Sequence, residues 1–189
     1  TATPTFSSKS FIVADSEGHI LNERAGTDVR PIASITKLMV SLLASEQDLD
    51  EQLSIPRTRH VQSSIPRNIQ TLSRRELLTL SLVRSDNFAA QILCNNIENC
   101  IVRMRDTNFN EPTGLDKGNV STAQDLLKLM VASASNQTLS ELSSMPNAEI
   151  PTHGKTIKVR NTNPLTATLN IKLSKTGFTN PAGGCLVMI

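Results

Sequence analysis

The sequence is poor in aromatic residues: its 189 residues include five Phe and neither Trp nor Tyr. Stacking sites for single-stranded nucleic acid or sugar rings depend on aromatic side chains, so this composition argues against both. The net charge of +2 is too small to indicate a polyanionic partner such as nucleic acid. No apolar run approaches the roughly 20 residues of a transmembrane segment. No basic and apolar leader precedes Thr1, so any export signal lies outside this sequence.

Cysteine and histidine are also scarce. The three cysteines are predicted to be buried free thiols, since the spacing of Cys94 and Cys100 does not imply a bridge, although an oxidising compartment would permit one. None of the three, Cys94, Cys100 and Cys185, stands in a sequence context typical of a catalytic nucleophile. The three histidines are His19, His60 and His153. None forms a metal-ligand pattern with a cysteine, so no metal site is predicted.

Strand signals stand at both ends of the chain. Residues 11–14, a turn at 15–18 and Ile20-Leu21 predict a β-hairpin. From about residue 150, apolar residues alternate with polar ones, which predicts strands that include 157–159 and 169–173. Residues 178–184 predict a turn, and 185–189 a buried strand.

Helix signals lie between these strands. Apolar residues at helical spacing, from Ile35 to Leu43, predict a helix that begins at Ser34. Capping boxes at 73–76 and 121–124 predict two more helix starts, and a further helix is expected from Phe88 to about Ile97. Residues 52–71 are expected to be loop with short turns. Strands, helices and strands in this order predict an α+β fold with a mainly antiparallel sheet beside a helical lobe.

Three short motifs occur once each and in one order: Ser34-Ile35-Thr36-Lys37, Ser85-Asp86-Asn87 and Lys175-Thr176-Gly177. Such a set should arise by accident in well under about one chain in a hundred. Each motif alone has an ordinary structural explanation: a helix cap with a solvated lysine, a turn between helices, and a strand end. Together they indicate acyl transfer to a serine that is activated by lysine.

Residue chemistry suggests a role for each motif. Ser34 and Lys37 share one helix face, and burial together with a second cation would lower the pKa of Lys37 until its neutral amine could take the serine proton. The Ser34 N–H is one candidate oxyanion donor and that of Phe178 a second. Gly177 would let substrate approach the strand backbone closely.

The motifs and several longer stretches resemble low-molecular-weight penicillin-binding proteins, which are serine D,D-peptidases. The resemblance runs from about Ser10 to the last residue and is greatest to the D-alanyl-D-alanine endopeptidase branch. The longer stretches are 30–39, 111–115, 119–123, 160–163 and 175–180.

The resemblance implies a β-lactamase/penicillin-binding transpeptidase-like fold, as a single domain over residues 1–189. The sheet lobe would comprise about 9–30 and 150–189, and the helical lobe about 34–135. It also implies peptidoglycan stem peptides as substrate, β-lactam antibiotics as inhibitors, no metal, no organic cofactor, and a periplasmic or otherwise extracytoplasmic location.

The resemblance also implies roles for individual residues. The catalytic residues would be Ser34 as nucleophile, Lys37 as base, and Ser85 and Lys175 as the proton path to the leaving amine. The substrate-binding residues would be Asn87, Thr176, Gly177, Phe178 and Thr179.

The resemblance further predicts a truncated C-terminus. Members of the family continue with a strand in the middle of the sheet and a helix that covers one face, whereas this sequence ends at Ile189, before either. We therefore expect a sheet without its central strand. A fragment, a degenerate copy, and a protein that completes its sheet in another way all fit this expectation.

Other functions share these motifs. A carboxypeptidase would remove a terminal D-alanine, whereas an endopeptidase would cut the D-alanyl cross-link, and the Phe178 region together with the resemblance favours the endopeptidase. A class A β-lactamase would need a Glu-x-x-Leu-Asn pattern, which is absent from the sequence, and Glu111 is interpreted as structural. An inactive wall-binding or β-lactam-binding module is the alternative from a different functional class.

Overall fold

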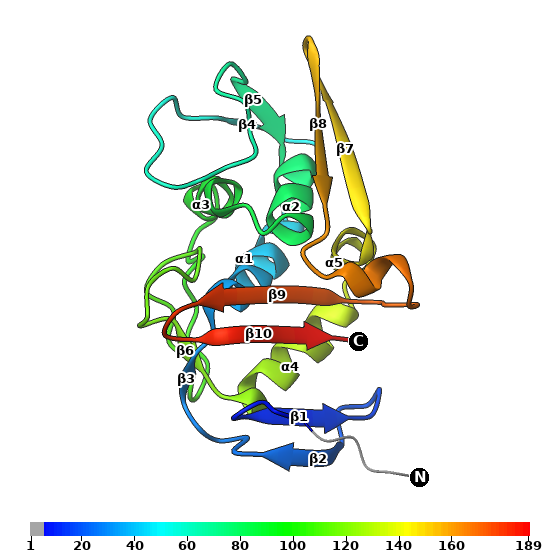
Figure 1. The fold of residues 1–189 in the computed structure, drawn as a ribbon. Helices are drawn as coiled ribbons and strands as arrows, with labels where there is room; N and C mark the ends of the chain where they lie inside the picture. Colours follow the sequence, from blue (N-terminus) through cyan, green and yellow to red (C-terminus); the bar gives the residue numbers. More distant parts are fainter. Residues whose placement is uncertain (1–5) are drawn as a thin grey trace.

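The computed structural model describes residues 6–189, in which helices occupy the centre and β-hairpins lie around them (Figure 1). The ten strands of this part pair as five two-stranded antiparallel sheets. The pairs are β1 (Phe11–Ala14) with β2 (Ile20–Arg24), β3 (Arg30–Pro31) with β6 (Val120–Ser121), β4 (Gln52–Ser54) with β5 (Thr71–Ser73), β7 (Asn147–Thr152) with β8 (Lys155–Arg160), and β9 (Ser174–Thr179) with β10 (Gly183–Met188).

Five α-helices form the centre, and α2 is the most enclosed. They are α1 (Thr36–Ser45), α2 (Arg74–Val83), α3 (Asn87–Asn95), α4 (Ala123–Ala134) and α5 (Gln137–Ser144); short 3-10 helices span Ala33–Ile35 and Pro164–Ala167. Helix α2 contacts α1, α3 and α5, and its leucines are fully or almost fully buried, as expected for a helix that neighbours surround. None of the helices described is long and apolar enough to cross a membrane.

The start of α2 confirms the first predicted capping box. The Ser73 side chain accepts a hydrogen bond from the Glu76 N–H, and the Glu76 carboxylate accepts one from the Ser73 N–H. The second predicted capping box is wrong. Helix α4 is capped by Thr122, whose side chain accepts from the Asp125 N–H, because the Ser121 hydroxyl bonds instead to Thr107.

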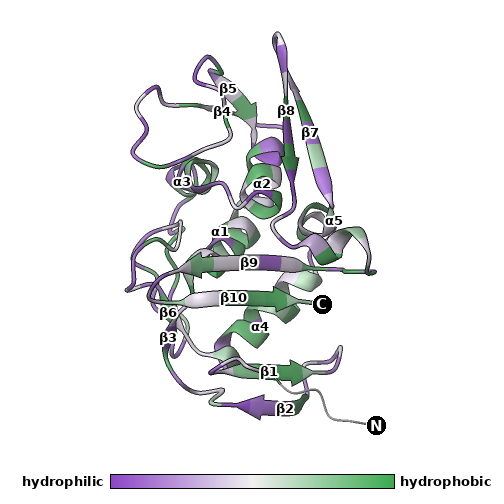
Figure 2. Cartoon of the chain, viewed as in Figure 1, coloured by the Kyte–Doolittle hydropathy of each residue, from purple (hydrophilic) through white to green (hydrophobic). Residues whose placement is uncertain are grey.

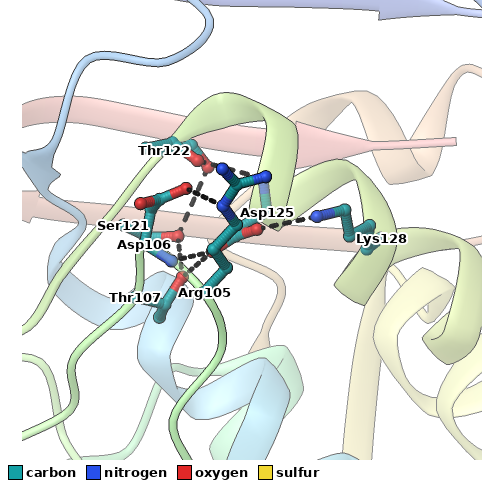
Figure 3. Close-up of polar contacts among 7 residues, drawn as sticks. All are labelled: Arg105, Asp106, Thr107, Ser121, Thr122, Asp125 and Lys128. Atoms are coloured by element: carbon teal, nitrogen blue, oxygen red, sulfur yellow. Dashed lines mark hydrogen bonds and ion pairs between the residues drawn. The ribbon is translucent and has the colours of Figure 1, made fainter.

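Asp125 holds the loop before β6 against the start of α4 (Figure 3). Its buried carboxylate accepts hydrogen bonds from the Asp106 N–H and the Thr107 hydroxyl, both at 2.8 Å, and pairs with Lys128. These bonds hold the pKa of Asp125 below its usual value although burial acts in the opposite direction. The contact fixes the N-terminal end of the loop that supplies residues 111–114 to the site described below.

The C-terminal third differs from the prediction in three ways. The strand expected over 169–173 is absent, and these residues form an irregular segment that leads into β9. The hairpin β7–β8 packs on α2 and pairs with no other strand, whereas one mainly antiparallel sheet was expected (Figure 1). Strand β10 is also less buried than expected: Val187 is buried, whereas Leu186 and Met188 are exposed.

The predicted free thiols are corrected for two cysteines. Cys94, at the end of α3, forms a disulfide with Cys100, while Cys185 is free. The Cα atoms of the bridged pair are 5.2 Å apart because the chain turns back after α3.

Candidate active site

Ser34 lies in the tight turn that leads into α1. Ala33, immediately before it, has φ of 49°, a left-handed conformation that costs free energy for a residue with a Cβ. The turn places Ser34 and Lys37 on one face, where the Lys37 Nζ donates a hydrogen bond of 2.7 Å to the Ser34 Oγ. The spacing of the first motif therefore brings the two side chains into contact, as predicted.

A loop from the middle of the chain completes the surroundings of Lys37. The Lys37 Nζ also donates to the backbone carbonyl of Thr113 at 2.6 Å. The Glu111 carboxylate shapes this loop, since it accepts hydrogen bonds from the N–H groups of Thr113, Gly114 and Asp116 at 2.7, 2.6 and 3.2 Å. Glu111 is structural, as predicted, and it acts on the site by aiming the Thr113 carbonyl at the lysine.

The loop carrying Glu111 packs directly on the turn before Ser34. Gly114 has φ of +82°, and a Cβ there would lie 1.9 Å from the Ala33 carbonyl oxygen. Only glycine fits at this contact. The backbone of 113–114 thus lies against the serine turn and helps to fix its conformation.

A second lysine–serine pair comes from β9 and the turn between α2 and α3. The buried Lys175 donates from Nζ to the Ser85 Oγ at 2.8 Å and to the Thr176 carbonyl at 2.7 Å. Ser85 has φ of 59°, which turns the chain sharply between the two helices. The second and third motifs therefore meet as predicted, although Lys175-Thr176-Gly177 lies within β9 and not at its end.

Burial changes the acid–base properties of both lysines. Desolvation lowers the pKa of Lys37 to about 7, against the opposing influence of the Glu111 and Asp86 carboxylates. Desolvation also lowers the pKa of Lys175 well below its usual value, and repulsion by Lys37 lowers it further. Burial, rather than Lys175, is thus the main reason that Lys37 can be neutral near pH 7.

Gly177 is needed for the close approach of β9 to Ser34. A Cβ at this position would lie 2.8 Å from the Ser34 backbone nitrogen and 3.1 Å from the Ala33 Cβ. The glycine therefore allows close packing of two protein segments. Its predicted contact with substrate stays a prediction.

The other predicted binding residues lie at different depths around this centre. The Thr176 hydroxyl donates to the Thr162 hydroxyl at 2.6 Å, so it is already engaged within the protein. Phe178 is 70% exposed on β9, while Thr179 and Asn87 are partly exposed. Asn87 begins α3 and lines an open groove beside Ser85.

Sequence reasoning assigned no role to Asp86, the middle residue of its motif. The buried Asp86 carboxylate caps α3 through the Ala89 N–H at 3.0 Å and also accepts the Ser63 hydroxyl at 3.1 Å. It thereby attaches the loop of residues 59–67 to the turn between α2 and α3. Aspartate is a preferred N-cap residue, so the sequence did offer a signal for the helix cap. It offered none for the bond to Ser63, which lies 23 residues away along the chain.

The three residues of the described chain whose ligand atoms could jointly hold a metal are Asp15, Glu17 and His19, at the turn of the β1–β2 hairpin. All three are exposed, and the Asp15 carboxylate is engaged by the N–H groups of the other two. Their contacts are those of a polar turn. The cluster is separate in sequence from the lysine–serine pairs and supplies nothing to them.

The chain is similar in sequence to known D-alanyl-D-alanine peptidases. A family model described as D-alanyl-D-alanine carboxypeptidase matches residues 1–189. The D-alanyl-D-alanine endopeptidases of Pseudomonas aeruginosa and Escherichia coli are each 40% identical to the chain, over 96% and 85% of its length. The chain spans 66% and 59% of the length of these two relatives.

Solved structures agree with this similarity. A D-alanyl-D-alanine carboxypeptidase from Mycobacterium tuberculosis is 25% identical, with a TM-score of 0.88 over 100% of this chain and 79% of the other. Penicillin-binding protein D2 from Listeria monocytogenes, in an ampicillin-bound form, is 28% identical, with a TM-score of 0.85 over 100% of this chain and 86% of the other. The predicted penicillin-binding-type α+β fold is confirmed by these neighbours.

Proposed function

The chain belongs to the D-alanyl-D-alanine carboxypeptidase family of peptidases, and we propose that the protein is a penicillin-sensitive serine D,D-peptidase that cleaves D-alanyl cross-links of peptidoglycan. One observation carries the proposal: two lysine–serine pairs, Lys37 with Ser34 and Lys175 with Ser85, converge beside β9. The similarity to two proteins named endopeptidase favours cross-links over terminal residues as the target.

The proposed mechanism begins with proton transfer within the first pair. The neutral Lys37 amine takes the Ser34 hydroxyl proton as Oγ attacks the D-alanyl carbonyl carbon. The N–H groups of Ser34 and Phe178 would stabilise the oxyanion that forms. The C–N bond then breaks as Ser85 gives its proton to the leaving amine and Lys175 returns a proton to Ser85. The proton that Lys37 took from Ser34 replaces the one that Lys175 gave, so Lys37 is neutral again. In the second half of the reaction Lys37 takes a proton from the attacking water and returns it to the Ser34 Oγ as the acyl group leaves.

We propose that Asn87, Thr176, Gly177, Phe178 and Thr179 line the substrate path. For Thr176, the hydroxyl would have to exchange its bond to Thr162 for one to a substrate carboxylate. The extracytoplasmic location that peptidoglycan requires is part of the same proposal. The disulfide between Cys94 and Cys100 supports it, since disulfides persist mainly in oxidising compartments.

Digestion of defined muropeptides tests the proposed substrate. The protein produced from its whole gene should convert a D-alanyl-cross-linked dimer into monomers, and a Ser34→Ala variant should not. A pentapeptide monomer that loses D-alanine faster than the dimer is cut would favour the carboxypeptidase. Release of neither product by a protein that penicillin does acylate would contradict the peptidase assignment and leave a β-lactam-binding module or a β-lactamase, which the rate of deacylation separates.

Replacement of Glu111 by Gln should shift the pH dependence of acylation downward. The negative charge of Glu111 raises the pKa of Lys37, so its removal lowers that pKa and keeps the amine neutral at lower pH. The wild-type rate of labelling by a fluorescent penicillin should rise with pH through about 7, and the variant should reach half of its maximum at lower pH. Its maximal rate should also fall, because the loop loses hydrogen bonds that aim the Thr113 carbonyl.

An Asp116→Asn variant is the matched control, since Asp116 lies in the same loop and its carboxylate bonds to Gly118 and Asn110. Its pH midpoint should stay at the wild-type value. An upward shift in Glu111→Gln, or equal shifts in both variants, would contradict the assignment of Lys37 as the base.

A further inference from the structure

A basic groove adjoins the turn between α2 and α3 that carries Ser85. It has a volume of about 930 Å³ and is formed by residues 59–67 and 84–87 with Lys155. Ser85 and Asn87 lie on its wall, so the groove is continuous with the proposed active site.

The groove carries excess positive charge. Its lining includes Arg59, Arg67, Arg84 and Lys155, but a single carboxylate, Asp86. That carboxylate is buried and already accepts hydrogen bonds from Ser63, Ser64 and Ala89. The excess is local, because the whole chain has a net charge of only +2.

One of the four cations supports the loop itself. The Arg59 guanidinium donates to the carbonyls of Ile65 and Pro66, and it lies 5.0 Å from the centroid of the Phe88 ring. Burial and the nearby charge of Arg67 lower the pKa of Arg59, and the Asp86 carboxylate, which acts in the opposite direction, offsets this only in part.

The other three cations are available to a ligand. Within residues 6–189, the side chains of Arg67, Arg84 and Lys155 form no hydrogen bond or ion pair, and all three are exposed. Like charges held near one another in a concave site raise the local positive potential, and a carboxylate bound there gains charge-assisted hydrogen bonds. Arginine also matches the planar geometry of a carboxylate.

We infer that this groove binds free carboxylates of the peptide acyl donor, upstream of the D-alanyl bond that is cut. The inference rests on the proposed function, which places the acyl donor beside Asn87. It adds a basis for selectivity: donors with a free carboxylate at this position should be preferred to donors in which that carboxylate is an amide.

Two synthetic peptides test the inference by binding. They are L-Ala-γ-D-Glu-L-Lys-D-Ala-D-Ala and the same peptide with the glutamyl α-carboxylate replaced by a carboxamide. Dissociation constants are measured with the Ser34→Ala form of the whole protein, so that cleavage does not interfere. We expect the carboxylate peptide to bind about tenfold more tightly, the effect of one good hydrogen bond to a charged group, and high salt to reduce the difference.

Removal of the arginines should abolish the preference. In Arg67→Gln/Arg84→Gln, added to Ser34→Ala, the ratio of the two constants should fall to near one. Arg103→Gln/Lys172→Gln removes the same charge from exposed positions outside the groove and should keep the wild-type ratio. With Ser34 present, both double variants should be acylated by penicillin at the wild-type rate, which separates loss of the groove from misfolding.

Equal binding of the two peptides by the parent protein, no binding of either, or a preference that survives the loss of both arginines would overturn the inference. Each of these results leaves the proposed function untouched if penicillin still acylates Ser34. Failure of that acylation, in turn, would count against the proposed function whatever the binding ratio.

Discussion

A Lys37→Met variant should be acylated by penicillin about 10²–10⁴ times more slowly than the wild type, the usual contribution of a general base. Methionine fills much of the space of the lysine stem but has no amine to take the Ser34 proton. The hydrogen bonds of 2.7 Å to Ser34 and 2.6 Å to the Thr113 carbonyl are lost together. Time-resolved labelling with a fluorescent penicillin gives the rate.

A Lys37→Arg variant separates a base from a mere positive charge. Arginine stays protonated at all relevant pH values, so it should be as slow as methionine. If the melting temperature of Lys37→Met equals or exceeds that of the wild type, the loss of acylation rate comes from the chemistry and not from unfolding. Removal of a buried amine need not destabilise a core. Rapid acylation of Lys37→Arg would contradict the role of Lys37 as the base.

Residues 1–189 expressed by themselves should self-associate. Within the described residues β10 pairs only with β9, and β1 only with β2, so each pair has an open edge. Helix α4 contacts both β1 and β10, and the hydropathy colouring marks most of β1 and the C-terminal part of β10 as hydrophobic (Figure 2). Open strand edges with apolar neighbours invite pairing between chains.

The expected energetic effect is large. Leu186 is 53% exposed on β10, and Leu21 is 68% exposed on β2. If such side chains leave roughly 200–300 Å² of apolar surface uncovered, about 5–7 kcal/mol of burial free energy is not realised. That is comparable with the ~5–15 kcal/mol stability of a whole domain. Sedimentation velocity at several concentrations should therefore show oligomers, with weak labelling by penicillin.

Charged replacements on the exposed positions give the matched test. Leu186→Lys should reduce association, because lysine on an open strand discourages pairing. Lys158→Gln, on the separate β7–β8 hairpin, should not. A monodisperse, cooperatively melting monomer of residues 1–189 with full acylation would show that the open edges matter little.

The predictable parts of the structure are those that depend on local spacing. Ser34 and Lys37 are three residues apart, and a helical turn brings them together in any context. The capping box at Ser73 and the interruption at Ser85 likewise depend on neighbouring residues. The meeting of Lys175 with Ser85 was predicted from the set of motifs and their resemblance to a family, because no spacing along the chain implies it.

The parts that were missed depend on contacts between distant segments. The acceptor of the second Lys37 hydrogen bond is the backbone carbonyl of Thr113, an atom that every residue type carries. The disulfide at Cys94 forms because the chain turns back after α3. Residues 169–173 alternate between apolar and polar because Ile171 and Leu173 are buried, yet this segment is not a β-strand. Burial can produce the period-two pattern without a strand.

Mass mapping of the β-lactam adduct tests the central claim most directly. The protein from its whole gene is incubated with penicillin, digested, and analysed for the peptide that gains the mass of the drug. We expect one adduct, on Ser34, and its complete loss in Ser34→Ala, with Ser85→Ala still labelled but slowly. An adduct on any other residue, or one that persists in Ser34→Ala, would contradict the assignment of Ser34 as the nucleophile.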